Sequence, residues 1–232
     1  MQIIRTTTQK FYQNFKDSWL KQILIYGDSL SWGIIPQTRM RLDFNERWSG
    51  IFEQTLTKLW APVRVFEDCL NGRRTNLEDP EKQGRNGVTG IQQKIEMHSP
   101  LALVVIMLGT NDFQDSHHYL SKDSASGLRE LILAIRSAQL EPCYQLPQIL
   151  IVAPPVIHEP QGSIAQKFLS YQTKDMNNLA QHYSDIAQSE HCHFFDANSV
   201  IQVSNLDGVH CNASQHKVLG NCLAQYVVDI LS

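Results

Sequence analysis

The sequence of 232 residues has no long apolar run, little excess charge and no regular cysteine spacing. Its longest apolar stretch, residues 101–108, is far too short to span a bilayer, which argues against a membrane-spanning helix. Residues 1–21 lack the continuous apolar core of a secretory signal peptide, because Arg5, Lys10, Lys16 and Asp17 interrupt it. We therefore expect a cytoplasmic protein without a membrane partner.

Charge, cysteine and histidine usage exclude further classes of partner. The 20 basic and 23 acidic residues give a net charge of −3, and this near balance argues against a nucleic-acid partner. Five cysteines without C-x-x-C spacing leave at least one thiol unpaired, which fits a reducing compartment best and leaves room for one disulfide. His191 and His193 alternate along the chain, but they have no third ligand nearby, so we expect no metal site.

Residues 26–33, Tyr-Gly-Asp-Ser-Leu-Ser-Trp-Gly, place a serine where an apolar strand must stop. The preceding residues 22–26 are apolar and rich in β-formers, and the small and polar residues that follow could begin a helix. A side chain on such a turn lies at the carboxyl edge of a sheet, beside helix N–H groups that stabilise negative charge. Ser29 is therefore the candidate nucleophile.

A serine nucleophile needs a base to accept its proton and a third group to orient that base. His210 and Asp207 offer both, since a spacing of three in a glycine-containing turn lets the carboxylate reach one imidazole nitrogen while the other faces the serine. Ester attack also creates an oxyanion, which needs preorganised donors. The Asn111 amide follows the most apolar run, and Gly72 offers a backbone N–H after another strand-like run.

Each of these groups also has an explanation that involves no catalysis. The Asp28-Ser29 pair could cap a helix, Asn111 could brace a turn, and Gly72 could simply supply a positive φ. The aspartate and histidine near the C-terminus could form a hydrogen-bonded pair on the surface. Only the occurrence of all four blocks together, in this order, favours the catalytic interpretation.

Gly-Asp-Ser-Leu near the N-terminus, a glycine block, Gly-x-Asn-Asp in mid-chain and Asp-x-x-His near the C-terminus resemble, in that order, the SGNH hydrolases, also called GDSL esterases and lipases. The resemblance extends from about residue 23 to the C-terminus. It implies a Ser29–His210–Asp207 triad and an oxyanion hole formed by the Ser29 N–H, the Gly72 N–H and the Asn111 side chain. It also implies a flavodoxin-like three-layer α/β/α sandwich that needs no metal or organic cofactor.

A subgroup of small aryl esterases and acyltransferases is most similar. Its members share the Gly-Asp-Ser-Leu-(Ser/Thr)-Trp-Gly block, the Arg47-Trp48 pair, the segment at 74–80 and Met-Leu-Gly-Thr-Asn-Asp at 107–112. Resemblance to this subgroup implies a preference for short acyl groups. Trp32, three residues after Ser29, could come round beside the nucleophile and fill the volume that a long acyl chain needs. The alternative is an ordinary core residue that faces the sheet.

Arg73 and Arg74 could face a substrate carboxylate or an oligomer partner, but pairing with Glu78 or Asp79 is the simpler expectation. The sequence leaves open whether the protein is a homo-oligomer.

Alternating strands and helices predict a mostly parallel five-stranded sheet covered on both faces, with all four blocks just after strands, at the edge where ligands bind. We expect strands at 22–26, 63–66, 101–108, 148–153 and 193–196. We expect helices at 48–60, 91–97, 126–139, 163–188 and 213–231, and a loop over 34–46 that could line the substrate entrance.

The length is within reach of one domain, so we expect a single domain over residues 1–232, with 1–21 as an N-terminal extension. Residues 9–21 could form an amphipathic helix laid on that domain.

These observations together predict a serine esterase that hydrolyses short-chain acetyl or aryl carboxylic esters through an acyl-enzyme, with a small-molecule ester as its partner. Two alternatives remain open: an acyltransferase that moves the acyl group to an alcohol, and a non-catalytic binding module on the same fold. The chemical competence of every catalytic position counts against the binding module.

Overall fold

The structure of the protein is a computed structural model that describes residues 20–169 and 172–231. The amphipathic helix expected over residues 9–21 lies outside the described residues, apart from its last two positions. Lys21, at the end of that range, already belongs to the first strand of the sheet.

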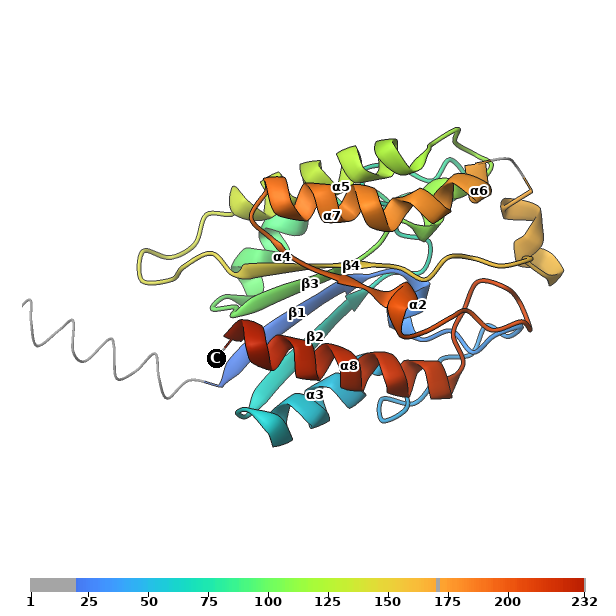
Figure 1. The fold of residues 1–232 in the computed structure, drawn as a ribbon. Helices are drawn as coiled ribbons and strands as arrows, with labels where there is room; N and C mark the ends of the chain where they lie inside the picture. The colour runs from blue at the N-terminus through green and yellow to red at the C-terminus, as the bar shows by residue number, and fades with distance from the viewer. Residues whose placement is uncertain (1–19, 170–171, 232) are drawn as a thin grey trace, which may run out of the picture.

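Five parallel strands form one sheet at the centre of the fold (Figure 1). The strands are β1 (Lys21–Gly27), β2 (Val63–Cys69), β3 (Leu103–Met107), β4 (Gln148–Ala153) and β5 (His193–Asp196). Their order in the sheet, β2-β1-β3-β4-β5, is that of a flavodoxin-like fold. The predicted five-stranded sheet is therefore confirmed, and every strand pair in it is parallel.

Helices cover both faces of the sheet (Figure 1). Helices α3 (Trp48–Leu59) and α8 (Ala213–Leu231) pack on one face, and α4 (Ile91–His98), α5 (Ser121–Arg136) and α7 (Leu179–Ser189) pack on the other. Successive side chains of a strand point to opposite faces, so Ile23 joins the core under α3 and α8 whereas Leu24 joins the core under α5 and α7. These are the three layers that the resemblance implied.

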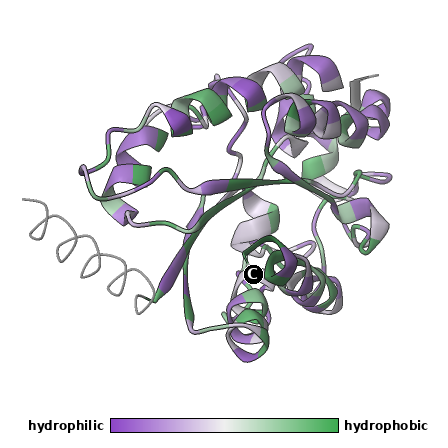
Figure 2. Cartoon of the chain, turned by 60° about the vertical axis from the view of Figure 1, so that its left-hand side comes forward, coloured by the Kyte–Doolittle hydropathy of each residue, from purple (hydrophilic) through white to green (hydrophobic). Residues whose placement is uncertain are grey.

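Hydrophobic residues follow the same division. The middle of the sheet is mostly hydrophobic, whereas the helices carry both hydrophobic and hydrophilic residues (Figure 2). A parallel sheet with helices on both faces needs continuous apolar strands, and the middle strand β3 is buried over its whole length.

Strand β2 is longer than predicted. The expected strand ended at Phe66, but pairing with β1 continues through Glu67 and Asp68 to Cys69. Glu67 and Asp68 are polar, so the apolar pattern stops before the strand does. Their carboxylates are held by arginines, Glu67 by Arg47 and Asp68 by Arg73, which makes a polar carboxyl end acceptable on this edge strand.

The long helix expected over residues 163–188 is wrong. The chain there forms a 3-10 helix (Gly162–Lys167), a short α6 (Gln172–Asp175), a second 3-10 helix (Met176–Asn178) and then α7. The first of these has no fully buried residue and packs on the core through the partly buried Ile164, which is too little contact to hold a regular helix there. In α7 the buried residues Leu179, Tyr183 and Ala187 recur at every fourth position, which is the spacing of a packed helix face.

All five cysteines are free thiols. Cys143 is exposed, and it lies on the loop that joins α5 to β4 at the amino edge of the sheet. Within residues 20–169 and 172–231, no helix is both long and apolar enough to cross a membrane.

Candidate active site

Ser29 begins α2 (Ser29–Trp32), a single helical turn directly after β1. Asp28 is the N-cap of this turn, because its Oδ1 accepts a hydrogen bond from the Leu30 N–H at 2.9 Å. The capping interpretation of the Asp28-Ser29 pair is therefore correct for Asp28. Ser29 itself is left at the carboxyl edge of the sheet with 8% of its surface exposed.

The structure brings Ser29, His210 and Asp207 into one hydrogen-bonded line. His210 Nε2 lies 3.1 Å from Ser29 Oγ, and His210 Nδ1 lies 2.8 Å from Asp207 Oδ2. His210 and Asp207 are 3% and 4% exposed, so this line is shielded from water along most of its length. The three residues come from segments that are 181 positions apart in the chain, and only the fold brings them together.

The Asp207 carboxylate accepts hydrogen bonds from three further N–H groups in this site. Oδ1 accepts from the backbone N–H groups of Val209 and His210, and Oδ2 also accepts from the Gln37 N–H at 3.1 Å. Burial alone would raise the pKa of Asp207, but the hydrogen bonds from His210 and Val209 outweigh it and lower the pKa to about 2. The carboxylate is therefore ionised at neutral pH.

Gln37 also lies at this site, although no motif in the sequence indicates it. It lies in the loop 34–46, where the sequence predicted only a general substrate entrance. Its φ of 61° turns its N–H toward Asp207, and its side chain donates to the Leu206 carbonyl at 2.6 Å. A left-handed glutamine leaves no periodic or motif signal, so only the three-dimensional structure reveals it.

A second loop holds the other side of the Asp207 segment. The His158 N–H donates to the Gly208 carbonyl at 2.8 Å, and the Gln161 N–H donates to the Asp207 carbonyl at 3.0 Å. Gly208 has a φ of 70°, and a Cβ there would lie 2.1 Å from the His158 carbonyl oxygen. The glycine between Asp207 and His210 is thus required by this close approach.

The proposed oxyanion donors lie after three adjacent strands. Gly27 of β1 pairs with Cys69 of β2 and with Met107 of β3, so the segments that carry Ser29, Gly72 and Asn111 leave the sheet side by side. Among the described residues, neither the Ser29 N–H nor the Gly72 N–H donates to any acceptor. Gly72 has a φ of 83°, which suits a glycine in this tight turn.

Asn111 differs from the other two donors because both of its amide hydrogens have acceptors. Nδ2 donates to Asp28 Oδ2 at 2.9 Å and to the Arg73 carbonyl at 3.1 Å. Asp28 precedes Ser29 and Arg73 follows Gly72, so the Asn111 amide lies between the neighbours of the two free N–H groups. An oxyanion would have to share one of these hydrogens.

Two more carboxyl groups are buried near the nucleophile. Burial, and more weakly the nearby Asp112, raise the pKa of Asp28 to about 7 in spite of its hydrogen bond from Leu30. Burial likewise raises the pKa of Asp112, although its carboxylate accepts hydrogen bonds from Ser124 and from both the hydroxyl and the N–H of Thr75. Asp112 therefore anchors loops behind the site and does not reach toward Ser29.

Trp32 is half-buried and packs in neither apolar core of the described chain. The Arg41 guanidinium lies over its ring at 4.9 Å from the centroid, and Arg41 Nε donates to the Trp32 carbonyl at 2.7 Å. Arg41 and Arg47 both pair with Glu67, at 3.2 and 2.6 Å. The core alternative for Trp32 is thus not what the fold shows, and its contact with an acyl chain stays a prediction.

Arg74 pairs with Asp79 at 3.5 Å, as the sequence suggested, whereas Arg73 pairs with Asp68 at 2.6 Å. Both guanidinium groups are buried and hold loops of the protein itself. They are therefore committed within the chain and not presented to a substrate carboxylate.

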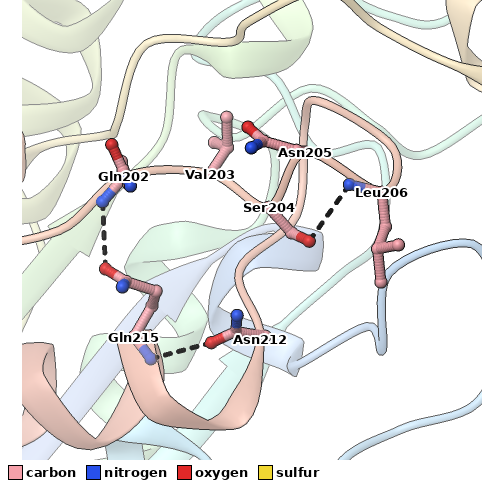
Figure 3. Close-up of a pocket in the computed structure, with 7 residues that line it drawn as sticks. All are labelled: Gln202, Val203, Ser204, Asn205, Leu206, Asn212 and Gln215. Atoms are coloured by element: carbon pink, nitrogen blue, oxygen red, sulfur yellow. Dashed lines mark hydrogen bonds between the residues drawn. The ribbon is translucent and has the colours of Figure 1, made fainter.

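Two hollows flank the loop before Asp207. The smaller, about 290 Å³, is lined by amide side chains that include Gln202, Asn212 and Gln215 (Figure 3). The larger, about 610 Å³, is lined by residues 156–160 and by parts of the neighbouring loops. Ser29, Trp32 and Asn111 line neither hollow, so the space for an acyl group is not part of them. In the part of the chain that the structure describes, no three His, Cys, Asp or Glu side chains gather as metal ligands.

Comparison with solved structures shows close relatives of the whole fold. The aryl esterase of M. smegmatis is 33% identical, with a TM-score of 0.85 over 91% of this chain and 100% of that one. A carbohydrate acetylesterase from Sinorhizobium meliloti is 29% identical, with a TM-score of 0.85 over 90% of this chain and 99% of that one. A lipase/acylhydrolase from Enterococcus faecalis, 14% identical with a TM-score of 0.64 over 92% and 98% of the two chains, shares the fold.

None of the curated proteins compared with the sequence matches it. The model of the GDSL-like lipase/acylhydrolase family matches residues 25–218, which include every block from Ser29 to His210. The order of these blocks, the parallel sheet and the matched residues agree, and the chain belongs to the GDSL-like lipase/acylhydrolase family of ester hydrolases.

Proposed function

We propose that the protein hydrolyses short-chain carboxylic esters through an acyl-enzyme formed on Ser29. The observation that carries the proposal is the line from Ser29 Oγ to His210 Nε2, at 3.1 Å, and from His210 Nδ1 to Asp207 Oδ2, at 2.8 Å. A nucleophile within hydrogen-bond reach of a base, with that base held by a buried carboxylate, is the arrangement that activates serine.

In the acylation step, His210 Nε2 takes the Ser29 hydroxyl proton while Oγ attacks the ester carbonyl carbon. The carbonyl electrons move to the oxygen and give a tetrahedral oxyanion. Asp207, ionised because its pKa is about 2, stabilises the imidazolium that forms on His210. When the C–O bond to the alcohol breaks, the imidazolium gives its proton to the leaving alkoxide and an ester of Ser29 remains.

The oxyanion needs donors that are already in place before charge develops. The Ser29 and Gly72 N–H groups fit this need because, in the described residues, they donate to nothing else. The Asn111 amide lies between their neighbours and supplies a third N–H by sharing a hydrogen. The turn that begins at Ser29 adds the N-terminal end of α2, although a single turn contributes little dipole.

Deacylation repeats the chemistry with a second nucleophile. His210 takes a proton from water, the hydroxide attacks the acyl carbon, and the collapse of the second oxyanion returns the proton to Ser29 and releases the acid. An alcohol in place of water would give a new ester, which is the acyltransferase alternative. The similarity of this chain to the M. smegmatis aryl esterase supports a substrate ester with an aryl alcohol. Its similarity to the S. meliloti carbohydrate acetylesterase supports an acetyl group.

We also propose that the protein acts as one domain, since the five strands form a single sheet and the family match runs across it. The predicted partner is a small ester that enters at the carboxyl edge of that sheet. The cytoplasmic location stays a prediction, and the oligomeric state stays open.

The test is turnover of p-nitrophenyl esters of increasing chain length by the wild type and by Ser29→Ala. We expect Ser29→Ala to lower kcat by roughly 10⁴-fold or more, because nucleophile and base act as one unit. Ser31→Ala is the matched control. Its hydroxyl is buried in the same helical turn without a hydrogen-bond partner, so its loss should leave turnover near the wild-type value.

Near-normal turnover by a well-folded Ser29→Ala protein would overturn the proposal. A fluorophosphonate that reacts with activated serines should label the wild type and not Ser29→Ala, and a wild type that is not labelled would favour the binding module. Product analysis in water with added alcohol separates hydrolysis from acyl transfer.

A further inference from the structure

Asn111 stands in a chain of hydrogen bonds that crosses the protein interior. Arg74 Nη2 donates to Gln114 Oε1 at 3.0 Å, and Gln114 Nε2 donates to Asn111 Oδ1 at 2.7 Å. Asn111 Nδ2 then donates to Asp28 Oδ2 and to the Arg73 carbonyl. Every hydrogen bond in the chain points the same way, from the guanidinium toward the segment that carries Ser29.

The groups at the two ends leave both amides only one orientation. A guanidinium has donors only, so the oxygen of Gln114 must face Arg74 and its NH2 group must face Asn111. At the other end the Arg73 carbonyl can only accept, so the NH2 group of Asn111 must face it whether or not Asp28 is ionised. Turning either amide over would bring like atoms together at about 3 Å.

The anchor of this chain is rigid. The Arg74 side chain has no exposed surface, and Asp79, Ser116 and the Glu78 carbonyl hold it besides Gln114. Gln114 and Asn111 are each 6% exposed, so water has little access to replace a lost partner. A buried donor or acceptor without a partner is costly, and the whole chain therefore keeps its direction.

We propose that Gln114 is a positioning residue, which holds the Asn111 amide with its NH2 group toward the catalytic edge while Arg74 holds Gln114. The inference rests on the proposed role of Asn111 as an oxyanion donor. Without the N–H of Gln114, only Asp28 and the Arg73 carbonyl hold the amide, and the buried Asn111 Oδ1 has lost its donor. The barrier to turning the amide over, which would present Oδ1 to the oxyanion, is then lower. An amide oxygen carries negative partial charge, so it would oppose the oxyanion instead of stabilising it.

The principal test is Gln114→Glu, which keeps the side-chain length and an acceptor for Arg74 but has no donor once it is ionised. The introduced carboxylate attracts the Asn111 NH2 group and repels its oxygen. We expect kcat on p-nitrophenyl acetate to fall by about 10²-fold, the loss of one oxyanion donor, with a much smaller change in KM. Gln114→Met neither donates nor repels, so it should lose only about tenfold.

Gln22→Met is the matched control. Gln22 Nε2 donates to the Pro100 carbonyl at 2.9 Å, near the start of β1 and so at the opposite edge of the sheet. The same chemical change there removes a hydrogen bond without touching the site, and kcat should stay at the wild-type value. Thermal unfolding of each variant shows how much stability each change removes.

Two measurements separate positioning from a purely structural role. In an Asn111→Ala background, Gln114→Glu should lower kcat no further, because no amide is left to orient. Lowering the pH should raise the kcat of Gln114→Glu relative to the wild type, because the protonated carboxyl regains a donor for Asn111 Oδ1. The inference would be overturned if the kcat losses of Gln114→Glu and Asn111→Ala multiply in the double variant. It would also be overturned if the kcat of Gln114→Glu relative to the wild type does not change with pH.

Asn111→Ala by itself separates this inference from the proposed function. It should lower kcat by about 10²-fold with a smaller effect on KM. If KM rises and kcat holds, Asn111 binds ground-state ester and its oxyanion role is wrong. If Asn111→Ala loses kcat while both Gln114 variants stay within about twofold of the wild type, only the positioning role is wrong. If Gln114→Glu does not fold, Gln114→Met in the Asn111→Ala background answers the same question.

Discussion

Two buried carboxyl groups lie at the carboxyl edge of the sheet, and their surroundings give them opposite properties. Asp207, at the C-terminal loop, accepts hydrogen bonds from three backbone N–H groups and from the His210 ring, and its pKa falls to about 2. Asp28, at the turn after β1, accepts from the Leu30 N–H and the Asn111 amide, and its pKa rises to about 7. Neither carboxyl has much exposed surface, at 4% and 0%, but Asp28 is the more deeply buried, and burial is the main cause of its raised pKa.

The contrast shows that a buried carboxyl stays ionised where its hydrogen-bond donors outweigh the cost of burial, as they do at Asp207 and not at Asp28. Each state suits its place. In the proposed mechanism, Asp207 must stay charged to stabilise the imidazolium of His210. A carboxylate that was firmly ionised at Asp28 would compete with the oxyanion for the Asn111 hydrogen, and we interpret its raised pKa as a weakening of that competition.

The largest effect that tests this contrast is on catalysis, with the same substitution at both positions. Asp207→Asn removes the charge that balances the imidazolium, and we expect kcat to fall by about 10³-fold or more. Asp28→Asn leaves the Ser29–His210–Asp207 line intact, so its kcat should fall by far less. Steady-state kinetics on p-nitrophenyl acetate compares the two, and equal losses would mean that Asp28 belongs to the catalytic line.

The two carboxyl groups should also change the stability of the fold with pH in opposite directions. The pKa of Asp28 is about 7 in the folded protein against 3.8 for an ordinary aspartate, so Asp28 costs the fold increasing stability as the pH rises from about 4 to about 7. The pKa of Asp207 is about 2, so its contribution is complete above about pH 4 and is lost as the pH falls toward 2.

Melting temperatures of the wild type, Asp28→Asn and Asp207→Asn over this range measure both slopes. The melting temperature of Asp28→Asn should rise relative to that of the wild type as the pH rises from about 4 to 7. The melting temperature of Asp207→Asn should approach that of the wild type only as the pH falls below about 4. A difference between Asp28→Asn and wild type that is constant with pH would show that Asp28 does not titrate in this range.

The smallest effect is expected at Trp32, on the helical turn that Asp28 caps. Acetate and butyrate esters should turn over faster than octanoate, and Trp32→Ala should raise the octanoate-to-acetate ratio of kcat/KM by about tenfold or more, because each methylene that fits is worth ~1–3 kcal/mol. Leu206→Ala, next to Asp207 and 54% exposed, is the control and should leave the ratio unchanged. Equal losses on all chain lengths in Trp32→Ala would place the acyl site elsewhere.

The fold could be predicted where the residues of a segment by themselves indicate a strand or a helix. β4 and α8 have the predicted bounds because most of their apolar residues are buried at the spacing of a strand and of a helix. The half-buried β5 has them because His193 and Asp196 enclose two phenylalanines. Helix α5 begins at Ser121, five residues before the predicted start, because a polar first turn is buried through tertiary hydrogen bonds. Ser121 donates to Asp175 and Ser124 donates to Asp112, and no periodicity of apolar residues can record such contacts.

The candidate site was predictable for the same kind of reason. Ser29, Gly72 and Asn111 stand in short blocks just after strands, and Asp207 and His210 stand in one block of the loop between β5 and α8. The order of these blocks in the sequence therefore carries the information. Gln37 and Gln114 stand in no block. Gln37 acts on the site through its hydrogen bond to Asp207 Oδ2, and Gln114 through its hydrogen bond to Asn111 Oδ1. Such contacts depend on the three-dimensional arrangement of the chain and leave no pattern in the sequence.

The exposed Cys143 gives the molecule a practical property. Thiolates are the form that reacts with alkylating reagents, and burial raises the pKa of Cys69, Cys192 and Cys211 and so keeps them protonated. Cys222, on α8, is half-buried, which leaves Cys143 as the most accessible of the five thiols. Cys143 stands on the α5–β4 loop, at the edge of the sheet remote from Ser29 (Figure 1). A maleimide support coupled to Cys143 would hold the protein by the amino edge of the sheet, with the carboxyl edge turned to the solution.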